Sequence, residues 1–169
     1  MPKTAPADDL IDRLLAEWKL ERPDLDASAM AIVGRVIHLG RRFEIGASKA
    51  LATYGLHYTD LDVLATLRRS GKPHRLSPGR LQASVLLTSG AMTACLRRLE
   101  QAGLIVRVPD AGDRRSICAE LTAAGRRLVD KAIAARFEEA HRRVAGLNAA
   151  ERRQLASLLR RLGQGREDD

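Results

Sequence analysis

Two neighbouring arginines, about two thirds of the way along the chain, have the sequence context of a DNA-contacting hairpin. The stretch "PDAGDRRS" places Asp113, Arg114 and Arg115 between two short apolar runs. A guanidinium on such a tip is attracted by the negative potential of a DNA minor groove, and its neighbour would meet phosphate. Asp113 lies two residues before Arg115, where it could pair with that guanidinium and fix its direction. The alternative is a plain turn in which the arginines only add solubility.

The helix predicted just before this hairpin has two chemically different faces. In "SGAMTACLRRLEQAG", the residues Met92, Cys95, Leu96 and Leu99 recur at helical spacing and are expected to face a core. The opposite face carries small or hydroxylic side chains and an arginine, which suit close approach to base edges and phosphates. The DNA contacts predicted from the sequence are therefore Thr88, Ser89, Gly90, Thr93, Arg97, Arg114 and Arg115, with Asp113 orienting Arg115.

The net charge of +8 is unevenly distributed along the chain. Residues 68–115 carry ten basic and three acidic side chains, whereas residues 1–67 carry eight basic and ten acidic ones. A positive field concentrated in one segment is typical of a surface that binds a polyanion. The alternative is a solvated, arginine-rich face without a partner. With only five aromatic side chains, the chain does not fit a single-strand binder built on base stacking.

Helical periodicity dominates the rest of the sequence. Helices are expected at residues 8–24, 27–55, 59–71, 78–84, 89–103, 123–146 and 149–163, and extended pieces at 74–76, 104–108 and 116–121. Their expected N-caps are Asp26, Thr59, Ser77, Thr88, Thr122 and Asn148. Two helices joined by a tight turn and followed by a hairpin are typical of the winged helix-turn-helix, whose second helix enters the major groove.

No arrangement of residues indicates an enzyme, a metal site or a cofactor. Cys95 and Cys118 lack metal-ligand spacing, and their apolar-periodic positions favour a core role over a redox switch. The histidines show no i, i+4 pairing with a ligand; they are His38, His57, His74 and His141. No run approaches the ~20 apolar residues of a membrane helix. Because the first residues contain no apolar signal-peptide segment, we expect a cytoplasmic protein.

The run from Leu87 to Gly125 resembles the DNA-binding lobe of the MarR family of bacterial transcriptional regulators. The similarity lies in "LRRLEQAGLI", in the Asp-x-Arg of "DRR" and in "LTAAG" at the start of the following helix. This resemblance implies an obligate homodimer that binds a pseudo-palindrome, mostly as a repressor. It also implies release by a small, often anionic or phenolic ligand. By the family's pattern, Arg115 would be the minor-groove arginine and Asp113 its partner.

The extra first helix further resembles the urate-responsive PecS and HucR branch of that family. This resemblance implies a ligand site with Trp18 and Asp62. The branch also places an arginine within the recognition helix, where this sequence has Cys95, and that difference argues against urate itself. Another cation would then have to bind an anionic ligand, and the candidates are Arg97, Arg98 and Arg35. Trp18 could instead be a core anchor of the first helix.

We therefore predict a mainly α fold with three parts. Residues 1–58 would form N-terminal helices, residues 59–121 a winged helix-turn-helix lobe with a two-stranded wing, and residues 122–169 C-terminal helices. The N- and C-terminal helices would form an intertwined dimerisation lobe. The predicted function is a homodimeric repressor that binds double-stranded operator DNA and responds to a small molecule. Two alternatives remain: a ligand-independent architectural DNA-binding protein, and a repressor that senses oxidants through cysteine.

Overall fold

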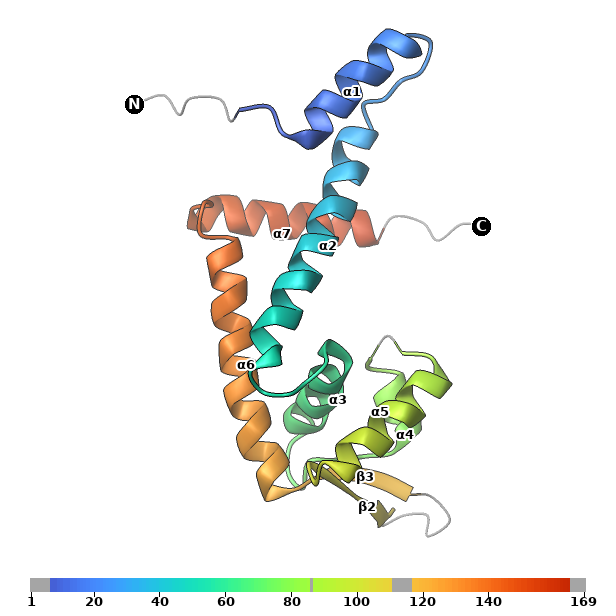
Figure 1. The fold of residues 1–169 in the computed structure, drawn as a ribbon, viewed down its shortest axis with the longest axis vertical. Helices are drawn as coiled ribbons and strands as arrows, with labels where there is room; N and C mark the ends of the chain where they lie inside the picture. Colours follow the sequence, from blue (N-terminus) through green and yellow to red (C-terminus); the bar gives the residue numbers. More distant parts are fainter. Residues whose placement is uncertain (1–6, 86, 111–116, 165–169) are drawn as a thin grey trace. The chain divides into compact units, whose positions relative to one another are not determined.

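The computed structural model describes residues 7–85, 87–110 and 117–164. Their backbone is mainly helical, with one small sheet (Figure 1). The chain forms two compact units, residues 1–46 and 47–169. Within the described residues, no helix is long and apolar enough to cross a membrane. This helical architecture agrees with the fold class predicted from the periodicity of the sequence.

The first unit consists of α1 (Leu10–Glu21) and most of α2 (Met30–Ala52). Asp9 caps α1 by accepting the backbone N–H groups of Ile11 and Asp12 at 2.8 and 3.0 Å. Ile11 packs on Gly34, where an added Cβ would come within 3.3 Å of the Ile11 side chain. The glycine therefore lets α1 lie close to α2.

The predicted start of the second helix at Asp26 is wrong, because α2 begins at Met30. The carboxylate of Asp26 accepts the backbone N–H of Ser28 at 2.9 Å and belongs to a turn that precedes the helix. Aspartate side chains bond to the backbone two residues later in turns as readily as at helix N-caps. The sequence pattern alone does not distinguish these two uses.

The second unit contains the remaining elements. They are α3 (Tyr58–Arg69), β1 (Arg75–Leu76), α4 (Pro78–Gln82), α5 (Ser89–Gln101), β2 (Ile105–Pro109), β3 (Ile117–Leu121), α6 (Ala123–Arg143) and α7 (Ala149–Gly163). Ser77, Thr88, Thr122 and Asn148 cap their helices as predicted, each accepting a backbone N–H. The predicted cap at Thr59 is wrong. His57 is the N-cap of α3, and its N–H donates to Asp60 at 3.0 Å.

The sheet has three strands: β2 and β3 are the two strands predicted for the wing, and β1 is added beside β3. All pairs are antiparallel in the order β1-β3-β2, with Arg75 opposite Glu120 and Arg107 opposite Ala119. The short segment 74–76 was expected to be extended, and the structure pairs its residues Arg75 and Leu76 with β3. Its pairing with β3 depends on residues about 45 positions away, which local sequence does not reveal.

One hydrophobic core holds the second unit together. Its buried side chains come from the end of α2, from α3, α4, α5 and α6 and from the strands, and the largest include Leu51, Leu64, Leu67, Leu81, Leu99 and Ile105. Gly125 in α6 makes a backbone approach that no other residue permits, because a Cβ there would lie 2.0 Å from the carbonyl oxygen of Leu104. The start of α6 is thereby seated directly against the chain segment that enters β2.

Candidate functional site

Helix α5 has one buried face and one exposed face, as the sequence predicted. Met92, Cys95, Leu96 and Leu99 are all buried. Thr88 is the N-cap of the helix, and its Oγ1 accepts the backbone N–H of Ala91 at 3.3 Å. Because the apolar stripe anchors α5 on the core, the opposite face is presented at the surface on a rigid element.

Helix α4 precedes α5 and is joined to it by a polar contact. Ser77 caps α4 with Pro78 at its first position, and Leu81 is fully buried beneath it. The Gln82 side-chain amide donates to Ser89 Oγ at 3.0 Å, which links the end of α4 to the first residue of α5. The two helices and their connection thus form a helix-turn-helix.

The exposed face of α5 brings together four of the residues predicted to contact DNA, Ser89, Gly90, Thr93 and Arg97. Ser89, Gly90, Thr93, Ala94 and Arg97 line an open hollow of about 470 Å³. The Thr93 hydroxyl donates to the Ser89 carbonyl at 3.0 Å, so its oxygen lone pairs remain available as acceptors. Among the residues that the structure describes, Arg97 has no ion pair, which leaves its guanidinium available to an external anion.

The strands after α5 form the base of the predicted wing. β2 and β3 pair from Ile105 with Leu121 to Pro109 with Ile117. The Cys118 thiol contacts Asp110 Oδ2 at 3.0 Å near the end of the ladder. The predicted tip residues Asp113, Arg114 and Arg115 lie outside the described residues. Their roles stay predictions.

Asp60 is a functional candidate that the sequence analysis missed. Its side chain is buried, and its carboxylate accepts hydrogen bonds from Arg98 in α5 and from the His57 N–H. Burial alone would raise the pKa of Asp60, but hydrogen bonds from Arg98, His57 and Cys95 bring it below its ordinary value. The available signal was an acid three residues after the helix N-cap. The partnership with Arg98 is not visible in sequence.

A second hollow, of about 460 Å³, lies between α3 and α6. Its lining includes Tyr58, Leu61, Asp62, Arg69, Arg136 and Phe137. Asp62 was predicted as a ligand residue, and its pKa is raised by burial, against the opposing influence of Arg69 and Arg136. The hollow therefore combines two aromatic rings, guanidinium groups and one partly desolvated carboxylate. Of these residues, only Asp62 was named from the sequence.

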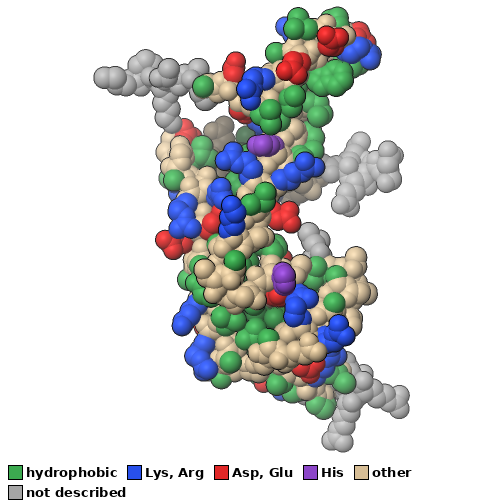
Figure 2. Space-filling view, in the orientation of Figure 1, with side chains coloured by type: hydrophobic (Ala, Val, Ile, Leu, Met, Phe, Trp, Pro, Cys, Tyr) green, Lys and Arg blue, Asp and Glu red, His purple; other side chains and the backbone are tan. Residues whose placement is uncertain are grey.

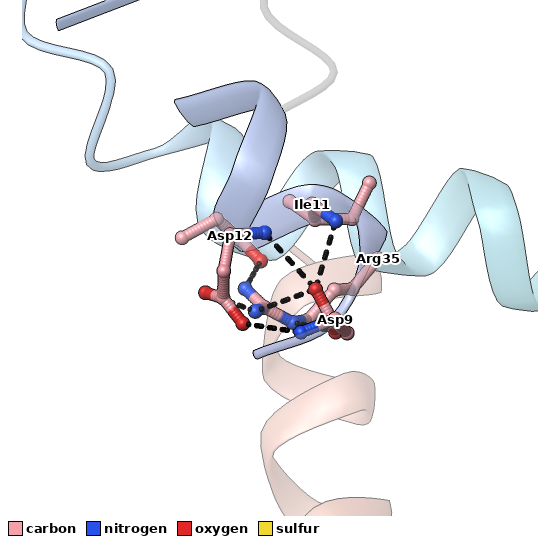
Figure 3. A network of polar contacts seen from close by, with 5 residues as sticks. Asp9, Ile11, Asp12 and Arg35 are labelled. Atoms are coloured by element: carbon pink, nitrogen blue, oxygen red, sulfur yellow. Dashed lines mark hydrogen bonds and ion pairs between the residues drawn. The ribbon is translucent and has the colours of Figure 1, made fainter. Parts of the chain in front are cut away.

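Two arginines suggested as cations for an anionic ligand are already paired. Arg35 donates to Asp9 at 2.9 Å and to Asp12 at 2.5 Å, and it also bonds to the Ala31 carbonyl (Figure 3). Arg98 is held by Asp60. Neither arginine is therefore free to bind an anionic ligand, because either would have to give up a carboxylate to do so. Trp18 is 57% exposed in α1.

The cysteines have the environment of core residues. Cys95 and Cys118 are both buried. Burial, together with the Asp60 carboxylate, raises the pKa of the Cys95 thiol to about 12. Since the thiolate is the reactive form, such a thiol is a poor oxidant sensor. The described residues contain no cluster of potential metal ligands.

Similarity to a regulator of known class decides the family. The chain is 32% identical to the HTH-type transcriptional regulator PecS of Dickeya dadantii over 152 residues, which cover 90% of this chain and 92% of the relative. The chain belongs to the MarR family. A MarR-family sequence model matches residues 54–116, the segment from the turn before α3 to the wing. DNA binding through a winged helix-turn-helix is thus shared with the MarR-family regulators it resembles.

Solved MarR-family structures share the fold. A MarR variant from Escherichia coli complexed with operator DNA superimposes with a TM-score of 0.69 at 21% identity, covering 92% of this chain and 99% of that one. BpsR of Bordetella bronchiseptica superimposes with a TM-score of 0.70 at 22% identity, covering 80% and 94%. DNA binding by BpsR is regulated by 6-hydroxynicotinic acid. At these identities the likeness concerns the fold alone.

Proposed function

We propose that this MarR-family regulator is a homodimeric repressor that leaves a palindromic operator when a small anionic or phenolic ligand binds. The supporting observation for DNA contact is the exposed face of α5. Small side chains allow a close approach to base edges, and Arg97 lacks a competing carboxylate among the described residues. In this proposal Thr88, Ser89, Gly90, Thr93 and Arg97 contact the operator.

The wing supplies the second part of the proposed interface. Arg115 would enter the minor groove, Asp113 would orient it, and Arg114 would meet phosphate. The support is the segment's basic sequence and its location after the β2 strand, whose partner β3 begins at Ile117. An arginine pre-oriented by an acid loses less rotamer freedom on insertion than a free one. A bacterial regulator of this kind would act in the cytoplasm, where the chromosome lies.

The ligand is proposed to bind in the hollow between α3 and α6. Tyr58 and Phe137 offer apolar ring faces, while Arg69 and Arg136 offer guanidinium groups for an anionic substituent. Arg136 is paired with Glu139 at 2.9 Å, but Arg143 also holds that carboxylate, so Glu139 would keep a partner if Arg136 turned to a ligand. Asp62 would accept a hydrogen bond from a phenolic or ring N–H group. The predicted ligand role of Trp18 rests on the family resemblance alone. Arg97 was named only as a cation that could replace the arginine missing at Cys95.

The proposal is tested by operator release. Fluorescence anisotropy with labelled DNA from the region upstream of the gene would be titrated with benzoate-type acids, phenols and urate. We expect at least one class to dissociate the complex. Asp62→Asn and Arg136→Gln should bind the operator as tightly as the wild type but resist release. If no compound released the wild type from the operator, the result would favour the ligand-independent architectural alternative.

A further inference from the structure

Asp60 joins the start of α3 to α5 through one buried carboxylate. Its Oδ2 accepts the His57 backbone N–H at 3.0 Å, and its Oδ1 accepts the Arg98 guanidinium at 2.5 Å. Oδ1 also contacts the Cys95 thiol at 3.3 Å. Residues 95 and 98 are one helical turn apart on the side of α5 that contacts α3. One side chain of α3 therefore contacts α5 at two neighbouring points.

The two members of this ion pair differ in their exposure. The Asp60 side chain is 3% exposed, whereas that of Arg98 is 44% exposed. A buried ion pair is weak evidence for stability, because desolvation offsets its attraction, but the pair restricts geometry. If the carboxylate became an amide, water could hydrate the Arg98 guanidinium. The amide oxygen could still accept the His57 N–H. The exchange Asp60→Asn is thus compatible with folding.

The geometry of the pair bears on the outer face of α5. Thr93, Ala94 and Arg97 lie on the exposed face of α5, whereas Cys95 and Arg98 contact Asp60 of α3. Any rotation of α5 about its axis would move the outer side chains relative to base edges. Direct readout requires close and directional contacts, so a small rotation would reduce specific binding.

We propose that Asp60 and Arg98 are positioning residues that set the rotation of α5 on α3, so that discrimination between operator and random DNA depends on their ion pair. The inference rests on the proposed contact of α5 with operator DNA. Neither side chain need touch the DNA. The inference goes beyond that contact because it assigns a function to a buried carboxylate that lies outside the exposed face.

The first test compares operator with random DNA of equal length. Asp60→Asn and Arg98→Gln should each weaken operator binding about tenfold, and the double variant should be no weaker than either single one. Affinity for random DNA should change less than about twofold. Loss of an acid would strengthen all DNA binding on charge grounds, so the expected sign for Asp60→Asn is opposite to that of the counterion effect. Asp130→Asn, which opens the exposed pair with Arg68, is the matched control.

Equal losses on both DNAs, accompanied by a lower melting temperature, would show a merely structural role and overturn the proposal. Additive losses in the double variant would also overturn it.

A second measurement needs no DNA and therefore separates this inference from the proposed function. The rate at which a disulfide reagent labels Cys95 would be followed in a Cys118→Ala background. Without Arg98, the unpaired Asp60 charge should slow labelling if α5 stays in place.

A loosened α5 should instead expose the thiol and speed labelling in Arg98→Gln several-fold. Slower or unchanged labelling would overturn the proposal even if operator binding had fallen. Faster labelling, combined with a selective loss on the operator, would support it. If the wild type bound no operator while Arg98→Gln still labelled faster, the proposed DNA contact would fail but the positioning of α5 would stand.

Discussion

At the scale of single residues, Asp62 lies in a place that disfavours its charged form. Its carboxylate lines the hollow between α3 and α6, and burial raises its pKa despite Arg69 and Arg136. The described residues offer this carboxylate no hydrogen-bond donor within range, in contrast to Asp60. Groups with perturbed pKa values are often found at functional sites. A change at Asp62 is therefore expected to affect ligand binding and protein stability in opposite directions.

We predict that Asp62→Asn stabilises the protein at neutral pH. With a raised pKa, the folded state binds more protons than the unfolded state just above the ordinary pKa of aspartate, so stability falls as pH rises through that window. Asparagine lacks this penalty. The urea midpoint of the variant should exceed that of the wild type at about pH 7, and the difference should vanish near about pH 3, where both states are protonated. A wild type as stable as the variant at neutral pH would mean that the two arginines fully compensate the burial.

Arg97 is the described side chain whose loss should most reduce specific binding. Arg97→Ala is expected to cost about 1–3 kcal/mol of operator binding, the range for a good base contact. Binding to random DNA should fall by less. Arg142→Ala, which removes an exposed arginine in α6, is the control for loss of one positive charge. Equal losses on both DNAs would place Arg97 among phosphate contacts.

At the scale of elements, the junction between the wing and α6 depends on one glycine. A Cβ at residue 125 would lie 2.0 Å from the Leu104 carbonyl oxygen, which also accepts the Thr122 backbone N–H at 3.1 Å. The start of α6 and the entry to β2 therefore touch through their backbones. Neither can move without changing the base of the wing.

Gly125→Ala should consequently destabilise the protein by about 1–3 kcal/mol, the usual cost of overpacking. Chemical denaturation followed by circular dichroism would measure the loss. Gly163→Ala is the matched control, because a Cβ there meets no atom within 4 Å, and its effect should be small. If the two variants were equally stable, the contact with Leu104 would have to relax without cost.

At the scale of the whole molecule, a large amount of apolar surface is exposed in the chain. Trp18, Ile32 and Ile37 are more than half exposed, and no residue of α7 is buried. Hydrophobic side chains are visible at the surface in Figure 2. In α7, the exposed leucines are Leu155, Leu158, Leu159 and Leu162. Patches of this kind on a regulator mark an interaction surface.

We predict that these exposed apolar faces form the interface of a homodimer burying more than ~2,000 Å². Light scattering at micromolar concentration should give the mass of two chains. The pair Leu155→Glu and Leu159→Glu, one turn apart, should shift the protein to monomers and weaken operator binding. Gln154→Glu adds charge to the same helix and should leave the dimer intact. A monomeric wild type would contradict the prediction.

The sequence by itself determined the helical architecture and the candidate recognition face. Most helix starts followed from capping residues such as Thr88 and Thr122, because a hydroxyl that accepts a backbone N–H acts over three residues. The buried and exposed sides of α5 followed from helical periodicity, which is also local. The family similarity added the expected DNA-binding role, since its motifs lie in one continuous stretch.

Tertiary structure decided what depends on residues distant in sequence. The pairing of β1 with β3, the ion pair of Arg98 with Asp60, and the placement of Arg136 in the same hollow as Asp62 all join separate segments. Charge alone suggested Arg98 and Arg35 as cations for a ligand, but each is committed to a carboxylate in the folded chain. A side chain's type sets what it is able to bind, and only the fold sets which partner is near enough to bind it.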